Sequence, residues 1–134
     1  MDECIFCKIV AKIAPAYIVY EDTDYLAFLD KFPQSRGHLQ FIPKKHYQWL
    51  YEIPEMGEFF TVAGHIIRVI IPALGVDHVT IASFGRQVAH AHLWIVPQYQ
   101  QNNVVEEGLG LKTGKEALDE VAHVIKDALL KTPA

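Results

Sequence analysis

Two histidines and a tryptophan, His90, His92 and Trp94, occupy alternate positions in the run from Gly85 to Pro97. Alternation at period two is typical of a β-strand, so we expect the three side chains on one face, with neighbours about 6.5–7 Å apart. The small and aliphatic residues between them are then predicted to face a core. A neutral imidazole nitrogen is both a nucleophile and a metal ligand near neutral pH. This segment is therefore the leading candidate in the sequence for chemistry.

The only two cysteines of the chain, Cys4 and Cys7, form a Cys-x-x-Cys pair near the N-terminus. With separated histidines further along, this pair has the ligand types and the close spacing of a structural zinc site. Two other interpretations are open, namely a pair of buried apolar thiols and a redox dithiol. The redox interpretation is the weaker one, because the pair does not follow a strand and open a helix as thioredoxin-like motifs do.

Hydrophobic periodicity and turn residues indicate the elements that must position these side chains. Besides the histidine segment, strands are predicted over 17–21, 25–30, 38–42 and 77–83, and helices over 5–10, 54–74 and 115–130. The segment 102–112 fits either a strand or a loop. Strands joined by hairpins, with the helices set apart in sequence, indicate an α+β domain: about five antiparallel strands, one long central helix and a C-terminal helix.

Length and charge exclude several classes of protein. The 134 residues fit a single domain over 1–134. The formal net charge is -4, and no basic cluster exceeds Lys44-Lys45, so the basic stripe that a nucleic-acid polymer requires is absent. No apolar run reaches the roughly 18 residues of a membrane helix, and the N-terminus lacks the pattern of a signal peptide. We therefore expect a cytoplasmic protein without a membrane partner.

Five segments, in order, resemble the histidine triad (HIT) family, in particular its Hint-like bacterial branch with an N-terminal Cys-x-x-Cys zinc motif. They are Cys4-Ile5-Phe6-Cys7-Lys8-Ile9, Val19-Tyr20-Glu21-Asp22, Ala27-Phe28-Leu29-Asp30, Gly37-His38 with Ile42-Pro43-Lys44-Lys45-His46, and the histidine segment itself. The resemblance implies a HIT-like fold and a homodimer whose sheet continues across the dimer. It also implies a nucleotide hydrolase or nucleotidyltransferase that binds a small molecule of the nucleoside monophosphate type.

The resemblance further implies that His92 attacks the α-phosphate of a nucleoside 5′-phosphate derivative, forming a nucleotidyl-histidine that water hydrolyses. His90 and His38 are expected in the same catalytic group. The residues expected at the nucleotide, by matched position, are Phe28, Asp30, Ser83, Arg86, Gln87 and Trp94. Of these, Asp30 is expected on the ribose hydroxyls. Arg86 has a second interpretation, as a solvated arginine in a turn.

The same resemblance implies a zinc site formed by Cys4, Cys7, His46 and His90. Two thiolates and two imidazoles complete a tetrahedron and leave no open catalytic position, so the zinc is expected to be structural. It would tie the N-terminus to the sheet and stiffen the segment that carries His92.

Trp94 departs from the family pattern, because it stands where the third histidine of the triad belongs. In the family that histidine helps to hold the bridging oxygen or to protonate the leaving group, whereas an indole N–H cannot exchange a proton. General acid assistance contributes about 10²- to 10⁴-fold, so poor leaving groups are expected to react slowly. The alternative is a catalytically weakened or inactive nucleotide-binding protein. A metal-dependent hydrolase is a third interpretation, and it requires an open zinc position.

Overall fold

The computed structural model describes residues 3–99 and 115–133 of the chain. Its elements are α1 (Ile5–Val10), β1 (Ile18–Glu21), β2 (Tyr25–Leu29), β3 (Leu39–Pro43), the short 3₁₀ helix η1 (Leu50–Glu52), α2 (Met56–Leu74), β4 (His78–Ala82), β5 (Leu93–Gln98) and α4 (Lys115–Lys131). The predicted α+β class with five antiparallel strands is confirmed. The ambiguous segment 102–112 lies outside the described residues.

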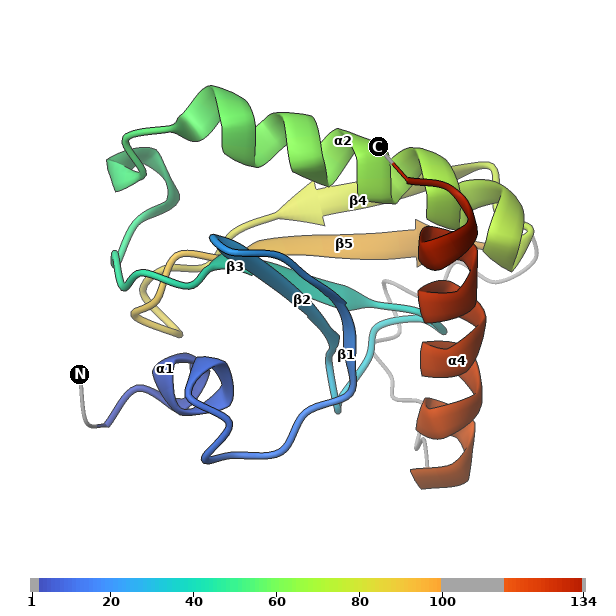
Figure 1. Ribbon diagram of the computed structural model, residues 1–134, viewed down its shortest axis with the longest axis horizontal. Helices are drawn as coiled ribbons and strands as arrows, with labels where there is room; N and C mark the ends of the chain where they lie inside the picture. The colour runs from blue at the N-terminus through green and yellow to red at the C-terminus, as the bar shows by residue number, and fades with distance from the viewer. Residues whose placement is uncertain (1–2, 100–114, 134) are drawn as a thin grey trace.

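The five strands form one antiparallel sheet in the order β1-β2-β3-β5-β4. Alternate strand residues face opposite sides, as the pleat requires. One side packs against α2 and α4 and includes Ala27, Phe41 and Ile95, whereas the other includes Leu26 and packs against α1. Figure 1 shows α2 running along the sheet, α4 at its side, and α1 near the N-terminus, on the opposite side from α2. The sheet face opposite α2 therefore packs against the short helix α1 and not against either long helix.

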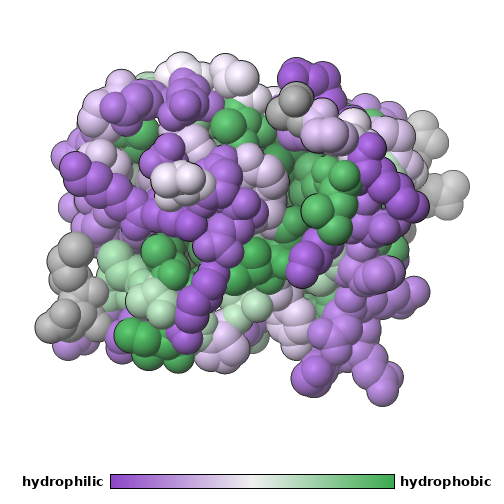
Figure 2. All heavy atoms as spheres, in the orientation of Figure 1, coloured by the Kyte–Doolittle hydropathy of each residue, from purple (hydrophilic) through white to green (hydrophobic). Residues whose placement is uncertain are grey.

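The two long helices are held to the sheet by one apolar stripe each. The buried residues recur at three- and four-residue spacing, and they are Phe59, Ala63, Ile66, Val69, Ile70 and Leu74 in α2, and Leu118, Val121, Ile125 and Leu129 in α4. Gly75 ends α2 with a left-handed φ of 74°, which a residue with a Cβ rarely adopts. Figure 2 shows a mostly hydrophilic surface over α4, on the right of that view.

Within the described residues, α2 is the one helix that is long and apolar enough to cross a membrane, judged by length and composition alone. The expectation that no apolar segment reaches this length is therefore wrong. The criterion is weak evidence for a span, because the core helix of a folded domain also meets it. In α2 the most buried side chains, such as Phe59, Ile66 and Ile70, lie in the main core cluster with the sheet.

The segment that carries the two histidines is a strand only in its second half. β5 begins at Leu93, and the N–H of Ala91 donates to the carbonyl of Tyr47 at 2.6 Å instead of to a strand partner. The prediction of one continuous strand with His90 and His92 in line is therefore wrong. Both imidazoles nevertheless lie against the ring of Phe6, at centroid distances of 5.8 Å and 5.9 Å.

Candidate active site and metal centre

Four side chains from three parts of the chain lie close together at helix α1. Cys4 and Cys7 come from α1 and the residue before it, His46 follows β3, and His90 precedes β5. The Nδ1 atom of His90 lies 3.3 Å from Cys4 Sγ, 3.5 Å from Cys7 Sγ and 3.2 Å from His46 Nδ1, and Cys7 Sγ lies 3.2 Å from His46 Nδ1. One donor atom from each residue thus lies within 4.8 Å of all the others.

These separations fit a tetrahedral zinc ion. With Zn–S bonds of about 2.3 Å and Zn–N bonds of about 2.0–2.1 Å, a tetrahedron separates its ligand atoms by about 3.3–3.8 Å. The second ring nitrogen of His90, Nε2, lies 2.9 Å from the carbonyl oxygen of Pro43. That hydrogen bond places the proton on Nε2 and leaves the Nδ1 lone pair for a metal, which is how metal-binding histidines are oriented.

The arrangement favours a metal over the other two interpretations of the cysteine pair. Both cysteines are free thiols, each only partly buried. Burial and the neighbouring Cys4 thiol raise the pKa of Cys7 to about 11. Two adjacent thiols and two imidazoles are a donor set that binds divalent cations. A bound cation would keep both cysteines as thiolates, despite the raised pKa of Cys7.

His92 is held by hydrogen bonds at both ring nitrogens. Its Nδ1–H donates to the carbonyl of His90 at 2.8 Å, and its Nε2 accepts the N–H of Phe84 at 3.0 Å. Burial lowers the pKa of His92, although the bond to the His90 carbonyl and the charge of Asp30 oppose this effect. The ring is therefore a neutral imidazole whose lone pair is on Nε2.

The contact with Phe84 has a consequence for substrate access. His92 is only 1% exposed, and the direction of its Nε2 lone pair is occupied by the Phe84 amide. An attacking nitrogen must have the reacting atom about 3–3.5 Å away along that direction. A ligand atom could approach Nε2 along that direction only if the turn that begins at Phe84 moved.

Trp94 packs against His38 and Phe84. Its ring centroid lies 4.5 Å from that of His38 and 4.7 Å from that of Phe84. The indole thus packs between the two rings in the position predicted for the third histidine. Because the indole N–H is a hydrogen-bond donor that is too weakly acidic to give up its proton near neutral pH, Trp94 itself supplies packing and no acid–base group.

Phe28 lies on the sheet face that packs against α1, where it contacts an aromatic residue that the sequence analysis missed. The ring of Phe6, from α1, lies 5.3 Å from Phe28, 5.8 Å from His90 and 5.9 Å from His92, each edge to face. The only signal in the sequence was an aromatic residue inside the Cys-x-x-Cys pair. Phe6 thus contacts one histidine of the Cys/His cluster, His92, and Phe28, the residue expected at the base or ribose.

Asp30 is also at the site, where its carboxylate already accepts internal donors. Oδ1 accepts the N–H of Phe32 at 2.8 Å, Oδ2 accepts Nε2 of Gln40 at 3.0 Å, and Nε2 of His38 lies 3.6 Å from Oδ2. Gln40 was not predicted. Its signal was a polar residue within the otherwise apolar strand β3.

Three predicted nucleotide-binding residues are not brought into the histidine cluster. Ser83, Arg86 and Gln87 are exposed around the turn that follows β4. Within the described part of the chain, no side-chain hydrogen bond joins them to the site histidines. Gln87 lines a surface cavity together with Cys4 and His46, which places it on the side of the metal cluster.

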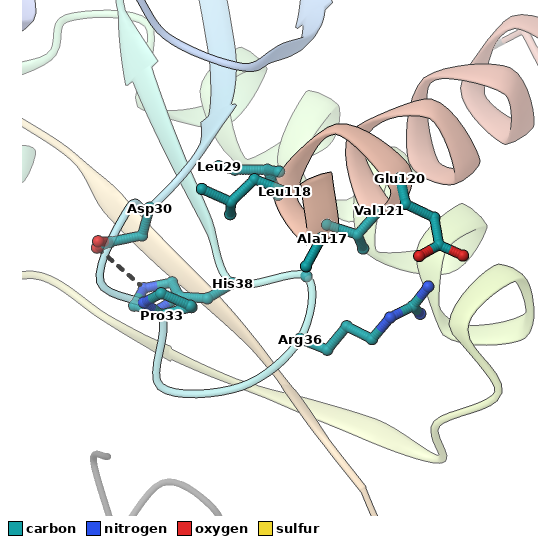
Figure 3. A pocket seen from close by; sticks show the side chains of 10 residues that line it. Leu29, Asp30, Pro33, Arg36, His38, Ala117, Leu118, Glu120 and Val121 are labelled. Carbon is teal, nitrogen blue, oxygen red and sulfur yellow. Dashed lines mark ion pairs between the residues drawn. The ribbon is translucent and has the colours of Figure 1, made fainter. Parts of the chain in front are cut away.

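A cavity of about 240 Å³ lies between the loop after β2 and the first turns of α4. Figure 3 shows Asp30 and His38 at one wall, joined by the dashed ion pair, and Leu118 and Val121 of α4 at the other. Arg36 extends from the loop along its edge. Asp30 and His38 thus line this cavity, although the His38 side chain itself is fully buried.

Burial of His38 predicts a loss of stability in mild acid. Burial lowers the pKa of His38 to about 4, although Asp30 opposes the shift, whereas an unfolded histidine titrates near 6.5. As the pH falls, the unfolded state therefore binds a proton on this histidine before the folded state does. The stability that comes from keeping His38 neutral is complete above pH 6.5 and is lost as the pH falls toward 4. Between pH 7 and pH 5 we expect the free energy of unfolding to fall by about 2 kcal/mol from this residue.

Urea denaturation of the wild type and of His38→Gln at pH 7 and pH 5 measures this contribution. The variant removes the titrating ring but can still accept the N–H of Gln34 that now bonds to His38 Nδ1. Its stability is expected to depend less steeply on pH than that of the wild type. An identical pH dependence in the two proteins contradicts the assignment.

The sheet, the two long helices, the cluster of two cysteines and two histidines, and the pair His90 and His92 together define a small α+β domain of the histidine triad class. The family model of the HIT domain matches residues 11–101, and the chain belongs to this family. An uncharacterized HIT-like protein of Methanocaldococcus jannaschii is 38% identical over 131 residues, which are 92% of this chain and 98% of that protein.

Two further relatives bear on the site. A protein named adenylylsulfatase HINT3, from Arabidopsis thaliana, is 33% identical over 134 residues, covering 92% of this chain and 68% of that protein. A solved structure of a Zn-bound histidine triad family protein from Mycobacterium smegmatis has a TM-score of 0.80 and 30% identity, and it covers 97% of this chain and 95% of that one. The HIT-like fold is thus confirmed. A zinc-bound protein is among the solved structures that this chain, with its cluster of two cysteines and two histidines, resembles.

Proposed function

We propose that this protein is a nucleotide phosphohydrolase or nucleotidyltransferase in which His92 is the nucleophile. Nε2 of His92 forms a bond to the α-phosphorus while the bond to the leaving group breaks, and water then releases the nucleoside monophosphate from the histidine. The observation that carries this proposal is the 2.8 Å hydrogen bond from His92 Nδ1–H to the carbonyl of His90. It fixes the neutral tautomer whose lone pair is on Nε2.

The other predicted residues receive their roles in the same proposal. Phe28 contacts the base or the ribose, and Asp30 accepts hydrogen bonds from the ribose hydroxyls. Arg86 and Gln87 reach the phosphate once the turn after β4 has opened, and a guanidinium matches phosphate geometry well. Ser83 contacts phosphate or ribose from the same turn.

A structural zinc ion held by Cys4, Cys7, His46 and His90 supports the nucleophile. These four side chains would hold the ion, which would supply a rigid link between α1, the segment after β3 and the segment before β5. His90 then links the metal cluster to His92, because its carbonyl is the acceptor for the His92 Nδ1–H. Four ligands leave no open position, which argues against a metal-dependent hydrolase.

Membership of the Hint-like branch, a cytoplasmic location and a homodimer belong to the same proposal. β4 is an edge strand of the sheet, and its Ile81 is 48% exposed. Edge strands with exposed apolar residues are ready to pair with another strand. Pairing of two β4 edges is the arrangement that would continue the sheet across a dimer.

The test of the proposed function is direct detection of the covalent intermediate. The protein is mixed with adenosine 5′-phosphosulfate, quenched in base, and its intact mass is measured. We expect a mass increase of one adenylyl group, located on His92 by peptide analysis. An adduct on another residue, or none under conditions of measurable turnover, contradicts the mechanism.

A second candidate, a nucleotide-binding protein with little or no catalysis, is favoured by one observation. The Phe84 amide occupies the Nε2 lone pair of His92, and Trp94 packs against the Phe84 ring. This candidate predicts binding of AMP by calorimetry without any adduct in the mass experiment. Detection of the adduct eliminates it.

Trp94 also predicts which leaving groups are tolerated. Sulfate and pyrophosphate leave without a proton, whereas an amine must be protonated as it departs. We expect the ratio of kcat/KM for adenosine 5′-phosphosulfate to that for an adenosine phosphoramidate to fall by at least about 10-fold in Trp94→His, because the histidine restores a general acid. Trp94→Phe, which supplies no acid, is the matched control. An equal ratio in all three proteins contradicts the assigned lack of acid catalysis.

A further inference from the structure

Gln40 is a polar side chain buried on the face of the sheet that carries the proposed site. It is 7% exposed. Its partners across the antiparallel ladder are Phe28 in β2 and Trp94 in β5. Directly opposed residues project to the same side of a sheet. Gln40 therefore stands between the residue proposed to contact the base or ribose and the residue that replaces the third histidine.

The orientation of the Gln40 amide follows from its contact with Asp30. A carboxylate can only accept hydrogen bonds, so the atom 3.0 Å from Asp30 Oδ2 is the amide nitrogen. The amide oxygen Oε1 is then directed elsewhere, where it is buried without a hydrogen-bond partner in the described structure. Buried acceptors are nearly always paired in native proteins. An unpaired one beside a proposed binding site indicates a donor that arrives with a ligand.

A second unpaired atom belongs to His38. Its Nδ1 accepts the N–H of Gln34 at 3.0 Å, so its Nε2 carries the proton. This Nε2–H is buried without a hydrogen-bond partner in the same described structure, and it lies 3.6 Å from Asp30 Oδ2. Asp30 is thus flanked by an unpaired acceptor and an unpaired donor. A hydroxyl group can satisfy both, because it donates one hydrogen bond and accepts others.

We propose that Gln40 is a specificity-determining residue that selects ribonucleotides over deoxyribonucleotides. Its Oε1 accepts a hydrogen bond from a hydroxyl of the ribose diol, while His38 Nε2–H donates to the diol and Asp30 accepts from it. The inference rests on the proposed function, since it requires a nucleotide in this site. It adds a residue outside the five segments that carry the family resemblance.

Calorimetry with AMP, 2′-deoxy-AMP and 3′-deoxy-AMP tests this inference. We expect the wild type to bind AMP about 10-fold more tightly than the weaker deoxy analogue, because losing that hydroxyl leaves buried groups unpaired. In Gln40→Met, which keeps the size but removes both polar atoms, the ratio is expected to fall to about 2- to 3-fold, through weaker AMP binding. Gln98→Met makes the same chemical change at a half-buried position of β5 and is expected to keep the wild-type ratio.

The outcomes separate the inference from the function on which it rests. If the wild type binds AMP but Gln40→Met keeps the same ratio, the role of Gln40 is wrong and the proposed function is untouched. If the wild type does not bind AMP, the proposed function fails and the inference with it. A crystal structure of the wild type with AMP is the second measurement, and it does not depend on the variant folding. A ribose hydroxyl at hydrogen-bond distance from Gln40 Oε1 supports the inference, and a water there with the ribose elsewhere overturns it.

Discussion

Replacing His92 by alanine is expected to lower the turnover of adenosine 5′-phosphosulfate by at least about 10³-fold and to remove the nucleotidyl adduct. The side chain supplies an unprotonated ring nitrogen on an imidazole that lies against Phe6 and is not one of the four residues of the Cys/His cluster. The loss should appear in kcat, because the substituted side chain takes part in bond formation. Initial rates under saturating substrate measure it.

The matched control for this variant is His123→Ala. His123 is an exposed histidine of α4, so its removal changes the same side chain without touching the site, and wild-type kcat is expected. Zinc content should be the same in both variants, whereas the thermal midpoint should be lower in His92→Ala, because that change removes a buried ring that makes two hydrogen bonds. Equal rates in His92→Ala and the wild type would falsify the assignment of the nucleophile.

Loss of the metal cluster is expected to have the largest effect on stability. With free zinc at about 1,000 times its dissociation constant, binding to the folded state alone stabilises it by about 4 kcal/mol. For a domain of this size we therefore expect Cys7→Ser to lower the thermal midpoint by about 10–15 °C. Activity should fall by about 10-fold or more, because His90 positions the carbonyl that orients His92. Metal analysis and differential scanning calorimetry measure these effects.

A chelator distinguishes loss of the metal from a general effect of substitution. Treatment of the wild type should reproduce the midpoint of Cys7→Ser, whereas treatment of the variant should change nothing further. Lys8→Ala, a change at an exposed position of the same helix, is expected to keep both the metal and the midpoint. A chelator-insensitive wild type that contains no zinc contradicts the structural zinc site.

The elements of the fold were predictable because each has a local signal. The apolar period of α2 and α4 and the alternation in the strands appear in short windows of sequence. The predicted boundaries agree with the structure to within one or two residues for β1–β4 and α2. The histidine segment was the exception. Alternating residue types suggested a strand from Gly85 onward, but the ladder with β3 stops at Leu93, and the backbone before it bonds to the loop around Tyr47.

The sequence by itself determined the residue types of the site: two cysteines at zinc spacing, a His-x-His pair, and a tryptophan in place of a third histidine. The family resemblance also named His46 and His90 as partners of the cysteines, and the tertiary structure brought all four together. Only the tertiary structure decided the state of each functional group. That His92 Nε2 is capped by the Phe84 amide, that Phe6 joins the cluster, and that Gln40 has an unpaired oxygen depend on contacts between elements distant in sequence. Residue type fixes which atoms can donate or accept, but the partner that each atom meets is set by packing, which no local pattern encodes.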